Sequence, residues 1–218
     1  MKDMMIGVDL AKAVFQVHGA HRTGEVQFRK KLTRKQFPAF MAQQEPCLVI
    51  FEACDSAHYW AREMEAIGHE VKLIAPQYVR PFVKRQKNDA ADAEAIVIAA
   101  CQPEMRFVAP KTVEQQCRAA VFRGRERLVH QRTADVNALR ALLYEHGHVF
   151  PAGICHLDRM TTLVEDEASD QPALIREECR DLLAQIAEKT VRIIERTKKL
   201  KMLAALMSDN HLGRISGR

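Results

Sequence analysis

The chain has 218 residues, of which 47% are hydrophobic and 28% charged, so it has the composition of a soluble globular protein with one domain and an appendage or two small domains. The net charge of +5 is too small to indicate a nucleic-acid partner by itself. The six cysteines include no CxxC pair, which argues against a zinc module. Without a secretory signal they favour reduced thiols in the cytoplasm, and the longest apolar runs are far too short to span a membrane.

The first part of the chain has the pattern of a small α/β domain. Five segments have the composition of strands: residues 4–10, 14–20, 25–32, 47–51 and 70–76. Three segments have helical spacing and end signals: residues 32–44, 56–68 and 88–101. This order predicts an antiparallel meander that continues through right-handed crossovers into a mixed, five-stranded sheet with helices on both faces.

After Pro110 the sequence becomes helical. Residues 112–146 contain no Pro and a single Gly, and 168–207 form a second long helix. The second helix has an apolar stripe, formed by Leu174, Cys179, Leu182, Leu183, Ile186, Val191, Ile194 and Leu203. An antiparallel hairpin, a dimerising coiled coil and packing against the first domain all satisfy this pattern. We therefore divide the chain into an α/β domain, a helical or coiled-coil region and a tail, at residues 1–110, 111–207 and 208–218.

Acidic residues stand at the ends of predicted strands and at the start of a helix. Asp9 closes the first strand and Glu52 the fourth, while Asp89 and Asp92 open the helix after the fifth. The first and fourth strands are neighbours in the predicted sheet, so these carboxylates can meet at one end of it. Hard divalent cations take oxygen ligands of this kind, and two such ions can clamp the oxygens of a phosphodiester. Taken singly, such an acid is more often a capping, turn or solvated residue, and it is the order of strand end, strand end and helix start that favours a metal site.

Basic residues flank the acidic cluster. The segment 80–87 leads directly into the acidic pair, and six arginines fall between residues 118 and 140. Such clusters supply salt-dependent contacts to phosphates, whereas a solvated helix face is the alternative and the one we favour for residues 192–201. The candidate nucleic-acid-binding residues are Arg80, Lys84, Arg85, Lys87, Arg118, Arg123, Arg125, Arg127 and Arg132.

Four ordered motifs together resemble the DEDD-type transposases of bacterial insertion sequences, the "IS one-ten" family: IGVDLAK, FEACDSAHYWAR, VKLIAPQYVRPF and KNDAADAEAI. The resemblance covers most of residues 4–101 and is compatible with the helical part to about residue 207. It implies a RuvC-like domain of the RNase H type. The residues that match the family's tetrad of magnesium (or manganese) ligands, and so its catalytic residues, are Asp9, Glu52, Asp89 and Asp92. It further implies dimerisation through the helical region and a structured guide RNA that pairs donor and target DNA.

The resemblance is incomplete at the end of the chain. Members of the family continue into a second domain with a serine nucleophile, and no serine lies in a matching context among Ser56, Ser169, Ser208 and Ser216. We therefore expect the metal-binding part of a truncated DNA transposase that acts by phosphodiester cleavage and strand transfer. The alternative is a non-catalytic remnant that binds nucleic acid or oligomerises. A RuvC-like junction nuclease fits the motifs less well, and the dispersed glycines do not form the phosphate loops of a sugar kinase or actin-like ATPase.

Overall fold

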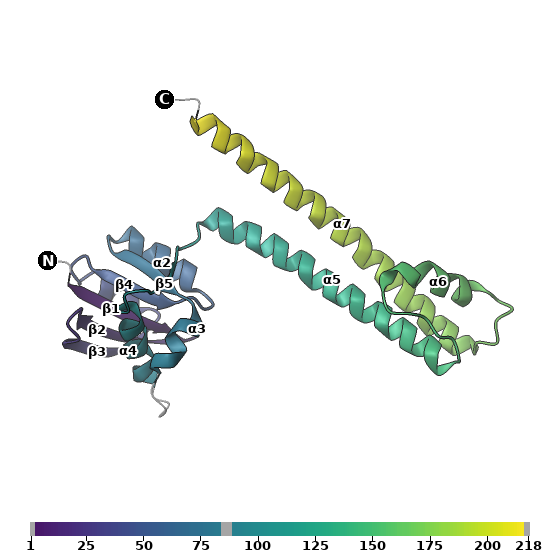
Figure 1. Ribbon diagram of the computed structural model, residues 1–218, viewed down its shortest axis with the longest axis horizontal. Coiled ribbons are helices and arrows are strands. Elements are labelled where there is room, and N and C mark those ends of the chain that lie inside the picture. Colours follow the sequence, from purple (N-terminus) through teal and green to yellow (C-terminus); the bar gives the residue numbers. More distant parts are fainter. Residues whose placement is uncertain (1–2, 84–88, 216–218) are drawn as a thin grey trace. The chain divides into compact units, whose positions relative to one another are not determined.

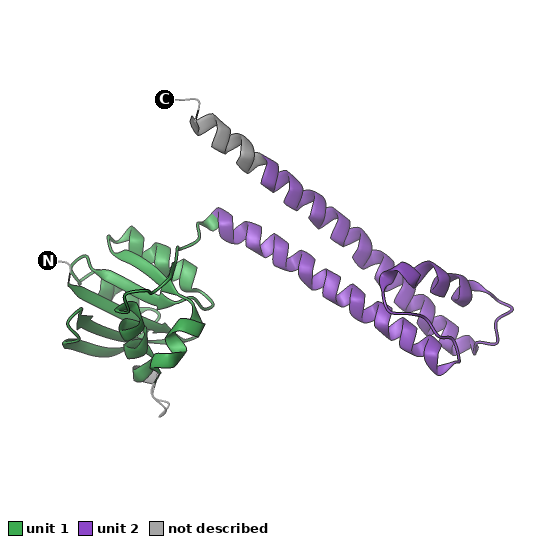
Figure 2. Cartoon of the chain, in the orientation of Figure 1, with its two compact units in different colours: residues 1–113 green, residues 114–218 purple. Residues whose placement is uncertain are grey.

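The computed structural model describes residues 3–83 and 89–215, with side chains at 3–83 and 91–205. The chain divides into two compact units, residues 1–113 and 114–218 (Figure 2). Each unit has its own hydrophobic core, so the packing that defines each one is local to it.

A mixed sheet of six strands forms the first unit, in the order β3-β2-β1-β4-β5-β6 (Figure 1). Antiparallel pairing joins the first three strands and parallel pairing joins β1, β4 and β5. The strands are β1 (Met4–Leu10), β2 (Val14–His21), β3 (Val26–Thr33), β4 (Leu48–Glu52), β5 (Glu70–Ile74) and β6 (Phe107–Val108). The five strands expected from the sequence are present in the expected order, which confirms the predicted mixed α/β sheet. The short antiparallel β6 was not foreseen, because two residues carry no periodic signal.

Helices cover both faces of this sheet. On one face α1 (Gln36–Met41) and α2 (Ala57–Ala66) enclose a core that includes Ile6, Val8 and Trp60. On the other face α3 (Pro76–Val79) and α4 (Asp89–Ala100) enclose a core that includes Met5 and Ile50. Successive residues of a strand point to opposite faces, which is why neighbouring residues of β1 belong to different cores.

The helix expected at residues 32–44 is wrong at its start. Strand β3 continues to Thr33, which pairs with Val14 of β2, and the helix begins only at Gln36. Thr33 and Gln36 exchange hydrogen bonds at this junction: the Thr33 N–H donates to Gln36 Oε1 at 3.0 Å, and the Gln36 N–H donates to Thr33 Oγ1 at 3.3 Å. Thr33 therefore ends a strand at the position where its sequence alone indicated a helix, because ladder pairing outweighs local propensity.

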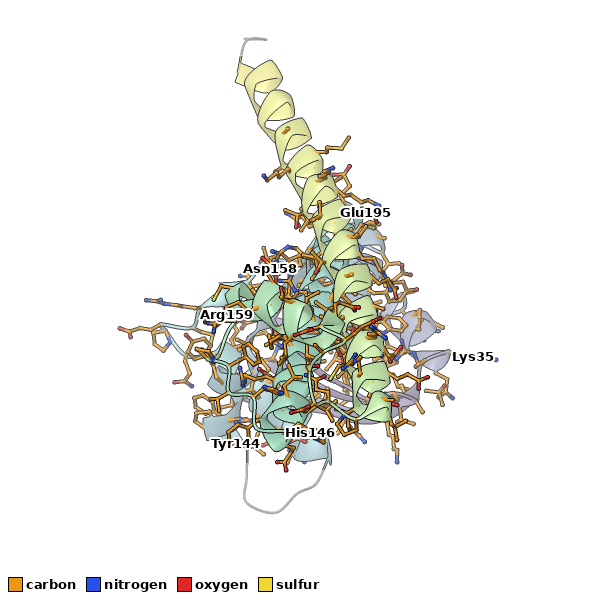
Figure 3. The ribbon with its side chains drawn as sticks, turned by 90° about the vertical axis from the view of Figure 1, so that its right-hand side faces the viewer. Lys35, Tyr144, His146, Asp158, Arg159 and Glu195 are labelled. Atoms are coloured by element: carbon orange, nitrogen blue, oxygen red, sulfur yellow. The ribbon has the colours of Figure 1, made fainter. Side chains whose placement is uncertain are left out.

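The second unit is an antiparallel helical hairpin. Its elements are α5 (Val113–Glu145), the short η2 (Ile154–His156), α6 (Leu157–Glu165) and α7 (Ala173–Ile215). Side-chain contacts join α5 to α7 in antiparallel register: Arg125 Nε donates to Thr197 Oγ1 at 2.9 Å, and Asp135 forms an ion pair with Lys189 at 2.9 Å. Figure 3 shows Tyr144 and His146 near the end of α5, Asp158 and Arg159 on α6, and Glu195 on α7. The second unit thus contains the antiparallel hairpin that was one of the arrangements left open by the sequence.

The apolar stripe expected on α7 is only partly buried. Cys179 and Ile186 lie in the hairpin core, and Leu182 and Leu183 pack against it. Three other members are exposed: Leu174 at 67%, Val191 at 56% and Ile194 at 49%. Between residues 190 and 197, the face of α7 that contacts α5 carries Thr190, Ile193 and Thr197 instead of Val191 and Ile194. Among the helices of the described residues none is long and apolar enough to cross a membrane.

Candidate metal centre

The ends of β1 and β4 bring Asp9 and Glu52 to equivalent positions. The parallel ladder pairs Met5 with Leu48 and continues to Val8 with Phe51, so Asp9 and Glu52 each follow the last of these pairs. Met5 and Leu48 belong to the core beneath α4, and alternation along each strand puts Asp9 and Glu52 on that same face. Both carboxylates therefore lie at the carboxyl ends of adjacent parallel strands, on the side that α4 covers.

Helix α4 contributes a third carboxylate to this corner. Asp92 is half-buried in the first turn of the helix, directly before the fully buried Ala93. The pKa of the Glu52 carboxyl is raised, first by burial and then by the negative charge of Asp92, while the positive charge of Arg80 opposes the rise. Asp92 and Arg80 are thus close enough to Glu52 to influence its ionisation.

The thiol of Cys54 is also influenced by these acids. Burial raises the pKa of the Cys54 thiol to about 11, and the negative charges of Glu52 and Asp9 add to that effect. Asp9, Glu52, Asp92, Arg80 and Cys54 therefore belong to one electrostatic cluster. Cys54 and its coupling to the acids were not singled out from the sequence, although its place two residues after Glu52 was the available signal.

The cluster is not a closed cage of ligands in the part of the chain that the structure describes. Within those residues, no group of three or more His, Cys, Asp or Glu side chains has the geometry to hold a metal ion. The side chain of Asp89, the fourth predicted ligand, lies outside the described side chains, as do Lys84, Arg85 and Lys87. The donor chemistry nevertheless fits a hard divalent cation, because carboxylate oxygens are its preferred ligands and their mutual repulsion is what such an ion relieves.

Two residues near the acids in sequence have other partners. Glu94 of α4 forms an ion pair with Arg29 of β3 at 3.3 Å. His58 of α2 accepts a hydrogen bond from the Lys111 N–H at 3.1 Å through Nδ1, and Arg62 donates to the Lys111 carbonyl at 2.6 Å. His58 therefore holds the segment that leads out of the first unit.

The candidate nucleic-acid-binding arginines of the second unit differ in their surroundings. Arg123 and Arg127 are exposed on α5, and Arg118 is half-buried. Arg125 and Arg132 instead turn toward α7, where Arg125 contacts Thr197 and Arg132 Nη1 donates to Thr190 Oγ1 at 3.4 Å. Their spacing of seven residues places both on one face of α5, a signal that was present in the sequence.

Comparisons with known proteins point to one family. A family model described as "Transposase", for IS110-type DEDD transposases, matches residues 6–148. The "Probable family 20 transposase" of Pseudomonas aeruginosa is 44% identical over 212 residues, which are 96% of this chain and 62% of that protein. The "Transposase for insertion sequence element IS1111A" of Coxiella burnetii is 36% identical over 211 residues, 96% of this chain and 58% of that protein.

A further relative and one solved structure are also similar to this chain. The "Transposase for insertion sequence element IS1328" of Yersinia enterocolitica is 44% identical over 172 residues, 79% of this chain and 51% of that protein. The chain thus spans between 51% and 62% of the length of these three relatives. RuvC of T. thermophilus, solved in complex with a Holliday junction substrate, is 12% identical with a TM-score of 0.38, covering 48% of this chain and 99% of that one.

Proposed function

The chain belongs to the family of IS110-type DEDD transposases, and on that premise we propose that it forms the metal-binding and DNA-binding part of the transposase of a bacterial insertion sequence. The reaction proposed for the whole enzyme is DNA transposition through phosphodiester cleavage and strand transfer. The observation that carries the proposal is the position of Asp9 and Glu52 at the carboxyl ends of the adjacent parallel strands β1 and β4, where the negative charge of Asp92 of α4 acts on Glu52.

We assign Asp9, Glu52, Asp89 and Asp92 as ligands of Mg²⁺ or Mn²⁺. When bound, such ions stabilise the charges that develop on the attacking and leaving oxygens of a phosphodiester. The carboxylates bind and orient the ions. Arg80 is exposed in the turn η1 (Arg80–Phe82) beside Glu52, where its guanidinium can contact a phosphate of the bound DNA strand.

Exposed basic residues support DNA as the partner. In the first unit Arg80 is exposed, and Lys84, Arg85 and Lys87, which lie outside the described residues, add basic charge next to it in the sequence. In the second unit Arg123 and Arg127 are exposed on α5 and Arg118 is half-buried. Arg125 and Arg132 are less available, because both donate to threonines of α7 and Arg125 also pairs with Glu126. Phosphate contacts of this kind give affinity without sequence specificity, which is consistent with a separate guide RNA choosing the target.

A second copy of the chain is a further proposed partner. The side chains of Val191, Ile194 and Met202 on α7 are exposed at 56%, 49% and 68%. Exposed apolar side chains spaced along one helix supply the contact area that helix–helix association needs. Homo-oligomerisation through the helical unit accordingly fits the proposal.

Thermal unfolding with and without metal tests the assignment of the ligands. We expect Mg²⁺ or Mn²⁺ to raise the melting temperature of the wild-type chain relative to EDTA, because a ligand of the folded state stabilises it by about 2.7 kcal/mol at a concentration 100 times its Kd. The Asp92→Asn variant should lose this rise. The matched control is Glu63→Gln, which removes one negative charge from an exposed position on α2 and should keep the rise in full. An equal rise in the wild type and Asp92→Asn contradicts the assignment.

A further inference from the structure

Gly7 lies in the middle of β1, where α4 packs directly onto the strand. A Cβ atom at this position would lie 2.5 Å from the carbonyl oxygen of Ala93, 2.7 Å from Cγ2 of Val97 and 3.3 Å from the Val97 nitrogen. Two of these atoms belong to the backbone of the helix and cannot rotate out of the way. Only glycine therefore permits this approach of α4 to the sheet.

The contact joins the two segments that carry proposed metal ligands. Gly7 stands two residues before Asp9 on the same face of β1, and Ala93 directly follows Asp92 in α4. The residue of α4 that packs here, Ala93, is fully buried and has a small side chain, which allows the helix to approach the strand closely. The distance between strand and helix at Gly7 thus sets how far Asp92 stands from Asp9 and Glu52.

A second contact joins α4 to β3, one residue after Ala93. Arg29 Nη2 of β3 lies 3.3 Å from Glu94 Oε2, and Arg29 Nε donates to Nδ1 of the buried His18 of β2 at 3.4 Å. The ion pair joins α4 to β3, whereas Gly7 determines how closely the helix packs on β1. A side chain at residue 7 would therefore push α4 away from β1 at Ala93 and Val97, directly after Asp92.

We propose that Gly7 is a positioning residue of the metal centre: it seats α4 on β1 and so sets the separation of Asp92 from Asp9 and Glu52 in the proposed site. The inference rests on the proposed function. Metal ligands must be held within about 0.5 Å of their working geometry, and displacements of tenths of an ångström or more are what a Cβ at Gly7 imposes. Gly7 touches neither metal nor substrate, and its effect passes through the helix.

The test compares Gly7→Ala with Gly19→Ala. Gly19 of β2 also has no space for a side chain, because a Cβ atom there would lie 2.5 Å from the ring of Phe28. Phe28 packs against the core of the other face, with its ring centroid 5.4 Å from that of Phe40. Both variants place a methyl group in an occupied space, but only the one at Gly7 presses on α4.

Binding of Mn²⁺ to the complete chain, followed by the electron paramagnetic resonance of free Mn²⁺, is the readout, with circular dichroism as the check on folding. We expect Gly7→Ala to bind Mn²⁺ about 10- to 100-fold more weakly, as when the supporting groups of a metal site are displaced. Gly19→Ala should bind with wild-type affinity even where its melting temperature in EDTA is lower.

Each result has a distinct meaning. Wild-type affinity in Gly7→Ala, together with weak binding in Asp92→Asn, overturns the inference and leaves the metal site standing. No Mn²⁺ binding by the wild type overturns the proposed function and the inference with it. If Gly7→Ala alone does not fold, Gly7→Ala/Val97→Ala is compared with Val97→Ala, because this pair keeps the contact with the Ala93 carbonyl and removes the contact with the Val97 side chain. The double variant should again bind more weakly, and equal affinities overturn the inference.

Discussion

At the scale of single residues, the role of each acid depends on the residues packed around it. The positions of Asp9 and Glu52 at strand ends could be predicted because strand ends and alternation are encoded locally, whereas the parallel register that brings the two level is a long-range feature. The coupling of Asp92 to Glu52 could be expected in kind, but its strength depends on how closely α4 packs on β1. That closeness is set by Gly7, whose importance no local pattern reveals because the atoms that exclude a Cβ are far away in sequence.

The raised pKa of Glu52 predicts how this residue affects stability in the absence of metal. The folded state holds the Glu52 proton above the ordinary pKa of 4.5, so stability that is fully present below 4.5 is lost as the pH rises through the raised pKa. At pH 7 in EDTA the Glu52→Gln variant should therefore melt at a higher temperature than the wild type, and this advantage should vanish near pH 4, where the wild type is protonated too.

The same variant should respond less to Mn²⁺ than the wild type, because it lacks one proposed ligand. Glu63→Gln, with its exposed side chain, should show neither effect. A lower melting temperature for Glu52→Gln in EDTA at pH 7 would show that the charge of Glu52 stabilises the empty site, contrary to this account.

At the scale of elements, the sequence was most informative where periodicity was long. The helix expected at residues 112–146 is α5 (Val113–Glu145), and the strand expected at 4–10 is β1 (Met4–Leu10). The predicted start of the helix near Thr33 was wrong because the pairing of β3 with β2 extends the strand through residues with helical signals. The face of α5 that meets α7 was also missed. The seven-residue spacing of Arg125 and Arg132 puts them on one face, but it does not say that this face meets the partner helix.

This difference between faces of α5 makes two arginines separable by experiment. Arg127 is exposed, whereas Arg132 donates to Thr190 of α7. We expect Arg127→Gln to leave the melting temperature unchanged and to weaken binding to non-specific duplex DNA, with the slope of log K against log salt reduced by about 0.9 for one lost phosphate contact. Arg132→Gln should instead cost about 1 kcal/mol of stability, the usual worth of a hydrogen bond.

Fluorescence anisotropy of labelled DNA across a salt series, beside thermal unfolding, measures both effects. The assignment of the exposed face of α5 to DNA is wrong if Arg127→Gln binds like the wild type at every salt concentration. Arg132→Gln is the comparison variant, because it removes the same charge from the same helix at a side chain that donates to α7, and we expect it to weaken DNA binding less than Arg127→Gln does.

At the scale of the whole molecule, the two units have different tasks in this account. The first unit holds the acidic corner on a rigid sheet, and the second presents exposed basic and apolar side chains along two helices. The match to the P. aeruginosa relative covers 96% of the chain and therefore extends over both units. The fold of the first unit could be predicted from strand order, whereas the partners of the second depend on surfaces that a sequence pattern does not distinguish from solvated faces.

The central claim is that carboxylates from β1, β4 and α4 bind a divalent cation, and a titration of Mn²⁺ into the wild type and Asp9→Asn tests it most directly. Free Mn²⁺ is counted by its electron paramagnetic resonance signal, so bound ions are measured without any assay of activity. We predict saturable binding of about one or two ions per chain in the wild type and at least about tenfold weaker binding in Asp9→Asn. Equal binding by both proteins, or no saturable binding by the wild type, would contradict the claim.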